Sequence, residues 1–136
     1  MIIKELEGKN IAIVAMGESQ LDFHLSLVHS NTYDEVWAIN CMGAVVNCDR
    51  VFMLDPASRF FDTEDAGTQT GIMRRWLPNT KVPIYTCELD DRAPSLVLYP
   101  LEEVAQYGDC AYLNNTVAFA IAYAMYQKVG AINLFG

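Results

Sequence analysis

The stretch Ile11-Ala-Ile-Val-Ala-Met16, followed directly by Gly17, decides the fold. Its residues are all apolar and show no alternation with polar ones, which is typical of a strand buried on both faces of a parallel sheet. Gly17 ends the run, and Ser19 then begins a predicted helix that reaches about Ser30. A buried strand that leads through a glycine into a helix predicts an α/β architecture.

The rest of the chain repeats this alternation of strands and helices. Further strands are predicted at residues 34–40, 50–55, 82–86, 96–99 and 131–135, and helical segments within 43–48 and 62–76 and at 101–107 and 115–128. The helix over 115–128 is apolar on all sides, so its outer face packs either on the same chain or on a partner subunit. We therefore predict a single Rossmann-like α/β domain over residues 1–136, with a mostly parallel sheet covered by helices on both faces.

The composition argues against several classes of function. The chain has 136 residues, a formal net charge of −8 and 52% hydrophobic residues, which is too apolar for a disordered chain. An acidic chain with no stripe of Lys or Arg argues against binding to nucleic acid. Since no apolar run reaches the ~18 residues of a membrane span and no signal pattern begins the sequence, we expect a cytoplasmic protein. We expect the cysteines to be reduced and mostly buried; they are Cys41, Cys48, Cys87 and Cys110.

Ligands of an open parallel sheet bind beyond the carboxyl ends of its strands. Polar residues and a glycine follow the predicted strands there and begin the last helix: Gly17, Ser19, Asn40, Asp55, Asn115 and Thr116. Gly17 allows close approach of a ligand, and the helix start behind it offers free amides to a phosphate. The alternative for Ser19 is a helix cap, in which Ser19 and Asp22 form a capping box.

Each remaining candidate also has more than one interpretation. Asn40 either forms a turn or reads a base or ribose hydroxyl with its amide. Asp55 either caps the turn at Pro56, accepts hydrogen bonds from ribose hydroxyls, or holds a metal. One residue at the start of the last helix must be its N-cap, which leaves the others for a ligand. The spacing supports no Ser/His/Asp or Cys/His catalytic arrangement.

Four segments, in this order, resemble a known group of nucleotide-binding domains. They are Ile11-Ala-Ile-Val-Ala-Met-Gly-Glu-Ser-Gln-Leu21, Ala38-Ile-Asn-Cys41, Val51-Phe-Met-Leu-Asp-Pro-Ala-Ser-Arg-Phe-Phe61, and Asn114-Asn-Thr-Val-Ala-Phe-Ala-Ile-Ala-Tyr-Ala-Met125 continuing through Ile132-Asn-Leu-Phe-Gly136. The chain resembles the nucleotide-binding half of bacterial sialyltransferases that use CMP-activated sialic acid, and the related motility-accessory-factor and hydroxymethylpterin-pyrophosphokinase-like domains of bacteria and phages. The resemblance implies a Rossmann-type fold with nucleotide phosphates at Gly17 and Ser19, ribose and base at Asn40 and Asp55, and the phosphate-side helix start at Asn115 and Thr116.

Three hypotheses of function remain open at this point. The leading hypothesis is a nucleotide or nucleotide-sugar binding domain of glycosyltransferase type. Its partner is a small molecule, and no residue is assigned a catalytic role. If the chain is phage-encoded, we expect the protein in the host cytoplasm. Glu18 in the first turn and the all-apolar helix favour a second, a non-catalytic oligomeric structural or interaction protein. The third is a pyrophosphoryl-transfer enzyme with Mg²⁺ at Asp55 and Asp90. Mg²⁺ is the single cofactor that any of the three hypotheses requires.

Overall fold

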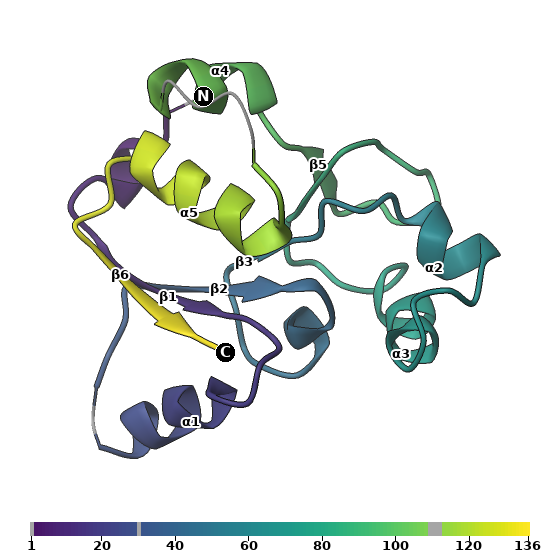
Figure 1. The fold of residues 1–136 in the computed structure, drawn as a ribbon, viewed down its shortest axis with the longest axis horizontal. Coiled ribbons are helices and arrows are strands. Elements are labelled where there is room, and N and C mark those ends of the chain that lie inside the picture. The colour runs from purple at the N-terminus through teal and green to yellow at the C-terminus, as the bar shows by residue number, and fades with distance from the viewer. Residues whose placement is uncertain (1, 30, 109–112) are drawn as a thin grey trace.

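A six-stranded sheet in the order β5-β4-β3-β2-β1-β6 forms the centre of the computed structural model, which describes residues 2–29, 31–108 and 113–136 (Figure 1). The strands are β1 (Asn10–Val14), β2 (Glu35–Ile39), β3 (Arg50–Phe52), β4 (Ile84–Thr86), β5 (Leu96–Leu98) and β6 (Ala131–Phe135). Every neighbouring pair of strands is parallel. The predicted Rossmann-like α/β class is therefore confirmed, and the sheet is wholly parallel.

Helices cover both faces of this sheet, as predicted (Figure 1). They are η1 (Lys4–Leu6), α1 (Gln20–Val28), η2 (Asn40–Ala44), α2 (Ser58–Asp62), α3 (Gln69–Trp76), α4 (Leu101–Gly108) and α5 (Thr116–Tyr126). The helices α4 and α5 lie on one face, and α1, α2 and α3 lie on the other. In the described part of the chain, no helix has both the length and the apolar character needed to cross a bilayer.

The core on the α5 face is built from large aromatic rings. Phe52 stacks on Tyr85 with ring centroids 4.9 Å apart, and Tyr123 from α5 packs within 5.5 Å of Phe52. Ala120 and Ala124, four residues apart on the buried side of α5, are fully buried, so the helix backbone can approach these rings closely. With α4 packed on its outer side, α5 lies between the sheet and another helix of the same chain.

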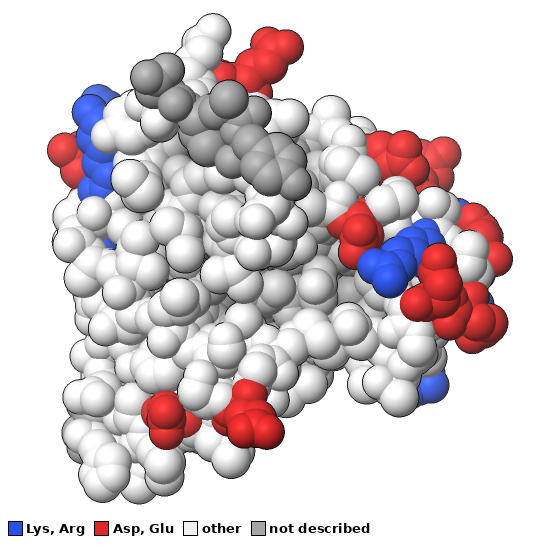
Figure 2. Space-filling view, viewed as in Figure 1, with Lys and Arg blue, Asp and Glu red and all other residues white. Residues whose placement is uncertain are grey.

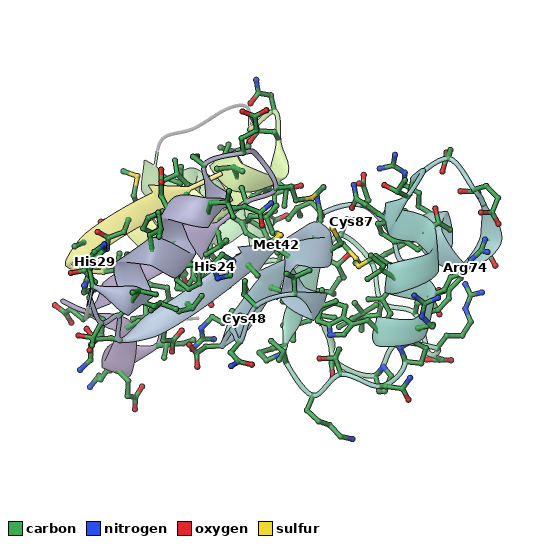
Figure 3. All side chains as sticks on the ribbon, turned by 90° about the horizontal axis from the view of Figure 1, so that it is seen from below. His24, His29, Met42, Cys48, Arg74 and Cys87 are labelled. Carbon is green, nitrogen blue, oxygen red and sulfur yellow. The ribbon has the colours of Figure 1, made fainter. Side chains whose placement is uncertain are left out.

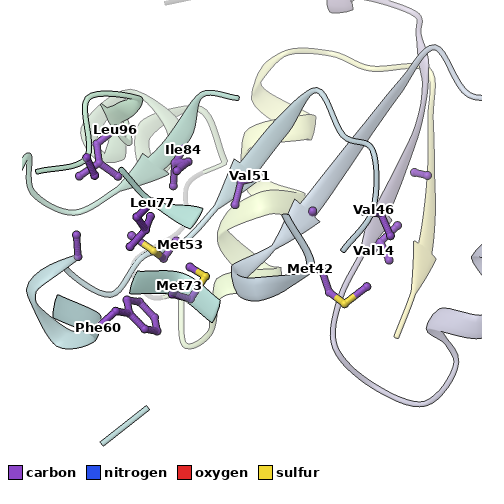
Figure 4. Packing of buried hydrophobic residues seen from close by; sticks show 14 of the residues in the cluster. Val14, Met42, Val46, Val51, Met53, Phe60, Met73, Leu77, Ile84 and Leu96 are labelled. Carbon is purple, nitrogen blue, oxygen red and sulfur yellow. The ribbon is translucent and has the colours of Figure 1, made fainter. Parts of the chain in front are cut away.

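The opposite core is aliphatic and methionine-rich. Met53, Phe60, Met73 and Leu77 are buried together beneath β3 and β4, and Figure 4 shows them side by side. Because Phe60 comes from α2, its burial anchors a short helix that was not predicted from the sequence.

A partly buried polar network ties the middle strands together on the α5 face. The guanidinium of Arg50 donates from Nε to Glu35 at 2.8 Å and from Nη1 to the Tyr85 hydroxyl at 2.8 Å. The Tyr123 hydroxyl then donates to that of Tyr85 at 3.2 Å. Burial raises the pKa of Tyr123, so its hydroxyl stays protonated at neutral pH and can donate.

Two sequence predictions need correction. The cysteines are not mostly buried: Cys41 and Cys48 are half-buried and Cys87 is exposed, while Cys110 lies outside the described residues. The predicted strand over residues 34–40 ends at Ile39, because the next residue turns the backbone into η2. Ser30, the predicted end of the first helix, also lies outside the described residues.

Candidate functional site

A pocket of about 370 Å³ opens at the carboxyl ends of β3 and β4, beside the start of α5. It brings together three of the predicted site residues, Asp55, Asn115 and Thr116. The other residues that line it are Leu54, Thr86, Cys87, Tyr99, Leu101, Leu113, Asn114 and Phe119. The pocket therefore combines polar groups from the strand ends and the helix start with an apolar wall.

The other three predicted residues, Gly17, Ser19 and Asn40, lie elsewhere along the same edge and do not line this pocket. The strand order switches between β1 and β6, so Gly17 and Ser19 stand at the switch point. The backbone of Gly136 lies against them: a Cβ on Gly17 would come within 2.7 Å of the Gly136 carbonyl carbon. The chain itself thus occupies the space directly against Gly17.

Ser19 does not cap α1 in the way that a capping box requires. Its side chain makes no cap hydrogen bond, and its Oγ accepts a hydrogen bond from the Gly136 amide at 2.8 Å. The bond therefore ties the start of α1 to the end of β6, which corrects the capping interpretation of Ser19.

Asn40 makes the turn that ends β2. Its φ of +51° lies in the left-handed region, which Asn tolerates better than most residues. Its Oδ1 atom is buried and has no hydrogen-bond partner among the described residues. The structure thus bears out the turn interpretation, and it leaves the amide oxygen unsatisfied.

Asp55 is held at the pocket by two neighbours. Its Oδ2 accepts a hydrogen bond from Nη1 of Arg59 at 2.7 Å, and its backbone carbonyl accepts one from the Thr86 hydroxyl at 3.1 Å. The side chain of Asp55 remains 44% exposed. The carboxylate is therefore oriented by an arginine four residues further along the chain and is still accessible to a ligand.

The start of α5 forms the polar end of the pocket. Asn115 has an extended backbone and accepts a hydrogen bond on Oδ1 from the Ala118 amide at 2.8 Å, so it is the N-cap. The amides of Thr116 and Val117 are first-turn groups with no partner inside a helix, and the dipole gives this end partial positive charge. A helix of 11 residues thus presents a seat for an anion at the pocket.

Tyr99 and Phe119 supply the apolar wall. Their rings meet edge to face, with centroids 5.3 Å apart, and the Tyr99 hydroxyl donates to the Phe119 carbonyl at 2.7 Å. This bond orients the tyrosine ring within the wall. Leu54 and Leu101 extend the apolar surface along the pocket. A flat heterocycle fits such a wall by stacking or by apolar contact.

The chemistry of the remaining polar groups does not favour a nucleophile or a metal. Partial burial and the Glu88 carboxylate raise the pKa of the Cys87 thiol, so it stays protonated at neutral pH. Asp90 pairs with Arg92 and lines a separate pocket from that of Asp55. Within residues 2–29, 31–108 and 113–136, His, Cys, Asp and Glu side chains form no group of three suited to a metal ion.

Part of this pocket was not predicted from the sequence. Thr86 ends a predicted strand, so its strand-end position was a usable signal. Tyr99 also ends a predicted strand and Phe119 lies within a predicted helix, but aromatic residues in apolar segments usually belong to the core. Comparison with protein-family models, curated proteins and solved structures finds no match.

Proposed function

We propose that the protein binds a mononucleotide or a nucleotide sugar, as a nucleotide-binding domain of the glycosyltransferase type, in the pocket between β3, β4 and α5. The observation that carries this proposal is the meeting of three unlike surfaces in one cavity. An anion seat, a carboxylate and an aromatic wall lie at the carboxyl edge of a parallel sheet. These match the phosphate, the ribose hydroxyls and the base of a nucleotide.

The size and charge of the pocket limit the ligand. About 370 Å³ is near the lower end of small-molecule sites, which favours one nucleotide over a dinucleotide. Among the described residues, those that line the pocket include no Lys or Arg, and the chain carries a net charge of −8. The phosphate therefore relies on helix amides, whose partial charge of about half a unit suits one phosphate group better than three. Without added Mg²⁺, nucleoside monophosphates should bind more tightly than triphosphates.

Calorimetric titration with CMP, UMP, GMP and their sugar conjugates tests the proposal. Asp55→Asn should weaken the binding of a ribonucleotide about tenfold and that of the 2′-deoxyribonucleotide much less, since a charged acceptor makes stronger hydrogen bonds to hydroxyls. Glu64→Gln is the matched control, because Glu64 also pairs with an arginine, Arg74, but lies outside the pocket. A folded protein that shows no binding at millimolar nucleotide would rule the proposal out.

A further inference from the structure

An apolar stripe runs along the outward side of α1. Leu21, Leu25 and Val28 are 66%, 54% and 76% exposed, and their spacing of four and three residues places them on one side of the helix. The inward side is marked by Phe23, which is 3% exposed and packs against Phe135 of β6. The helix therefore has two apolar sides, and one of them faces away from the sheet.

The fold gives no reason for this second apolar side. A surface helix normally carries polar residues opposite its core face, and a contiguous exposed apolar patch marks an interaction site. Figure 2 shows mostly uncharged side chains over α1 with acidic ones among them, in contrast to the dense cluster of charged side chains over α2 and α3. In a chain with a net charge of −8, such a surface is where two like-charged molecules can meet.

We infer that a second copy of this chain binds to the α1 stripe, with the two α1 helices packed antiparallel about a two-fold axis. The stripe is close to symmetric about Leu25, with Leu21 four residues before it and Val28 three residues after it. The two-fold axis therefore places Leu25 beside the partner's Leu25, and Leu21 against the partner's Val28. This is the self-complementary pattern that an isologous interface requires.

The polar residues that flank the stripe fit the same arrangement. Asp22 and His29 are seven residues apart, two helical turns to within about 20°, so they lie on one flank at opposite ends of α1. Both are exposed, and Figure 3 shows His29 at the end of α1. An antiparallel pair brings Asp22 beside the partner's His29, a carboxylate acceptor beside an imidazole donor, and aligns the helix dipoles favourably.

The extent of the surface sets the strength of this dimer. α1 has nine residues and spans about 14 Å, so a pair of such helices buries less than the ~1,200 Å² of a standard stable interface. A dissociation constant in the range from about 10 μM to 1 mM follows, because small apolar contacts with few polar pairs give transient complexes. The pocket lies on the opposite face of the sheet, where α5 packs, so this inference is independent of the proposed function.

Sedimentation equilibrium from 10 μM to 1 mM protein tests the inference. The unchanged chain should show a monomer–dimer equilibrium, and Leu25→Glu should abolish it by placing two carboxylates on the axis. Leucine and glutamate have similar helix propensities, and circular dichroism checks that α1 is retained. Leu98→Glu on β5 is the matched control, because Leu98 is also 54% exposed. The Leu98→Glu variant should dimerise with the same dissociation constant as the unchanged chain.

A charge swap tests the register. Asp22→Lys or His29→Glu alone should raise the dissociation constant of the dimer about fivefold, since each brings like or unpaired groups together across the axis. The double variant should bring the dissociation constant back to within about twofold of that of the unchanged chain. A chain that stays monomeric at 1 mM would overturn the inference. Three other results would also overturn the inference. They are a dimer that survives Leu25→Glu, an equal loss of the dimer in Leu98→Glu, and a double variant that stays as weak as the single ones.

Discussion

Asn115→Asp separates two roles of the residue that begins α5. In the structure, Asn115 caps the helix through Oδ1 and also lines the pocket. Aspartate is an equally good N-cap and adds a favourable charge at the positive end of the helix. We therefore expect the free energy of unfolding to stay within about 0.5 kcal/mol of that of the unchanged chain. The same carboxylate would repel a phosphate seated on the amides of Thr116 and Val117.

The size of that repulsion can be worked out. A carboxylate about 6 Å from a singly charged phosphate, at an effective dielectric of about 20, raises the binding free energy by about 2.8 kcal/mol. Asn115 is exposed, so water and salt reduce this by about half. The remaining ~1.4 kcal/mol corresponds to a tenfold weaker affinity.

Calorimetry with a nucleoside monophosphate and urea unfolding measure the two effects side by side. Asn115→Ala is the complementary variant: loss of the cap should cost about 1 kcal/mol and lower the melting temperature by about 3 °C, with little change in affinity. If Asn115→Asp binds the nucleotide as tightly as the unchanged chain does, the phosphate does not sit at the start of α5. The dipole of α5 would then not be what holds the phosphate.

Three further predictions concern stability. Glu35→Ala leaves the half-buried guanidinium of Arg50 without its bidentate partner, so urea unfolding should show a loss of about 2 kcal/mol, and a loss below 0.5 kcal/mol would contradict it. Arg92 lowers the pKa of Asp90 to about 2, so the pair stabilises the folded state above pH ~4 and this contribution disappears as the pH falls towards 2. Melting temperatures of Asp90→Asn and the unchanged chain should differ at pH 6 and converge near pH 2, and a constant difference would argue against the pair. Gly71→Ala, where a Cβ would meet only the tip of an arginine at 3.7 Å, should stabilise α3 by about 0.5–1 kcal/mol in calorimetry, and a lower melting temperature would contradict this.

The buried strands and the long apolar helix were predictable because their apolar pattern coincides with their burial. The ends of the strands were not. Met53 and Leu54 continue the apolar run of β3, but the strand ends at Phe52, and where a strand ends is set by its neighbours in the sheet rather than by its own sequence. The helix α2 was missed for the same reason: Phe60 holds it through a tertiary contact that no local pattern reveals.

The candidate site was predictable one residue at a time, but not as a group. Asp55 and Asn115 were identified because polar residues at a strand end and at a helix start indicate a site. Which of these positions meet depends on the strand order, which the sequence does not reveal. Two strand spacings, about 10 Å, separate β1 from β3, so Gly17 and Ser19 stand away from the pocket that contains Asp55.

The charges around the helix starts explain why an anion should prefer α5 over the first turn. The sequence resemblance implies a phosphate at Gly17 and Ser19, yet α1 carries Asp22 in its first turn and follows Glu18, while Gly136 lies against Gly17. No acidic residue lies in the first turn of α5. A carboxylate in the first turn offsets the favourable dipole for any second anion, and α5 has none there, while the Asp55 carboxylate in the same pocket is paired with Arg59. In a chain with a net charge of −8, we expect that difference to favour α5 as the place where the proposed phosphate binds.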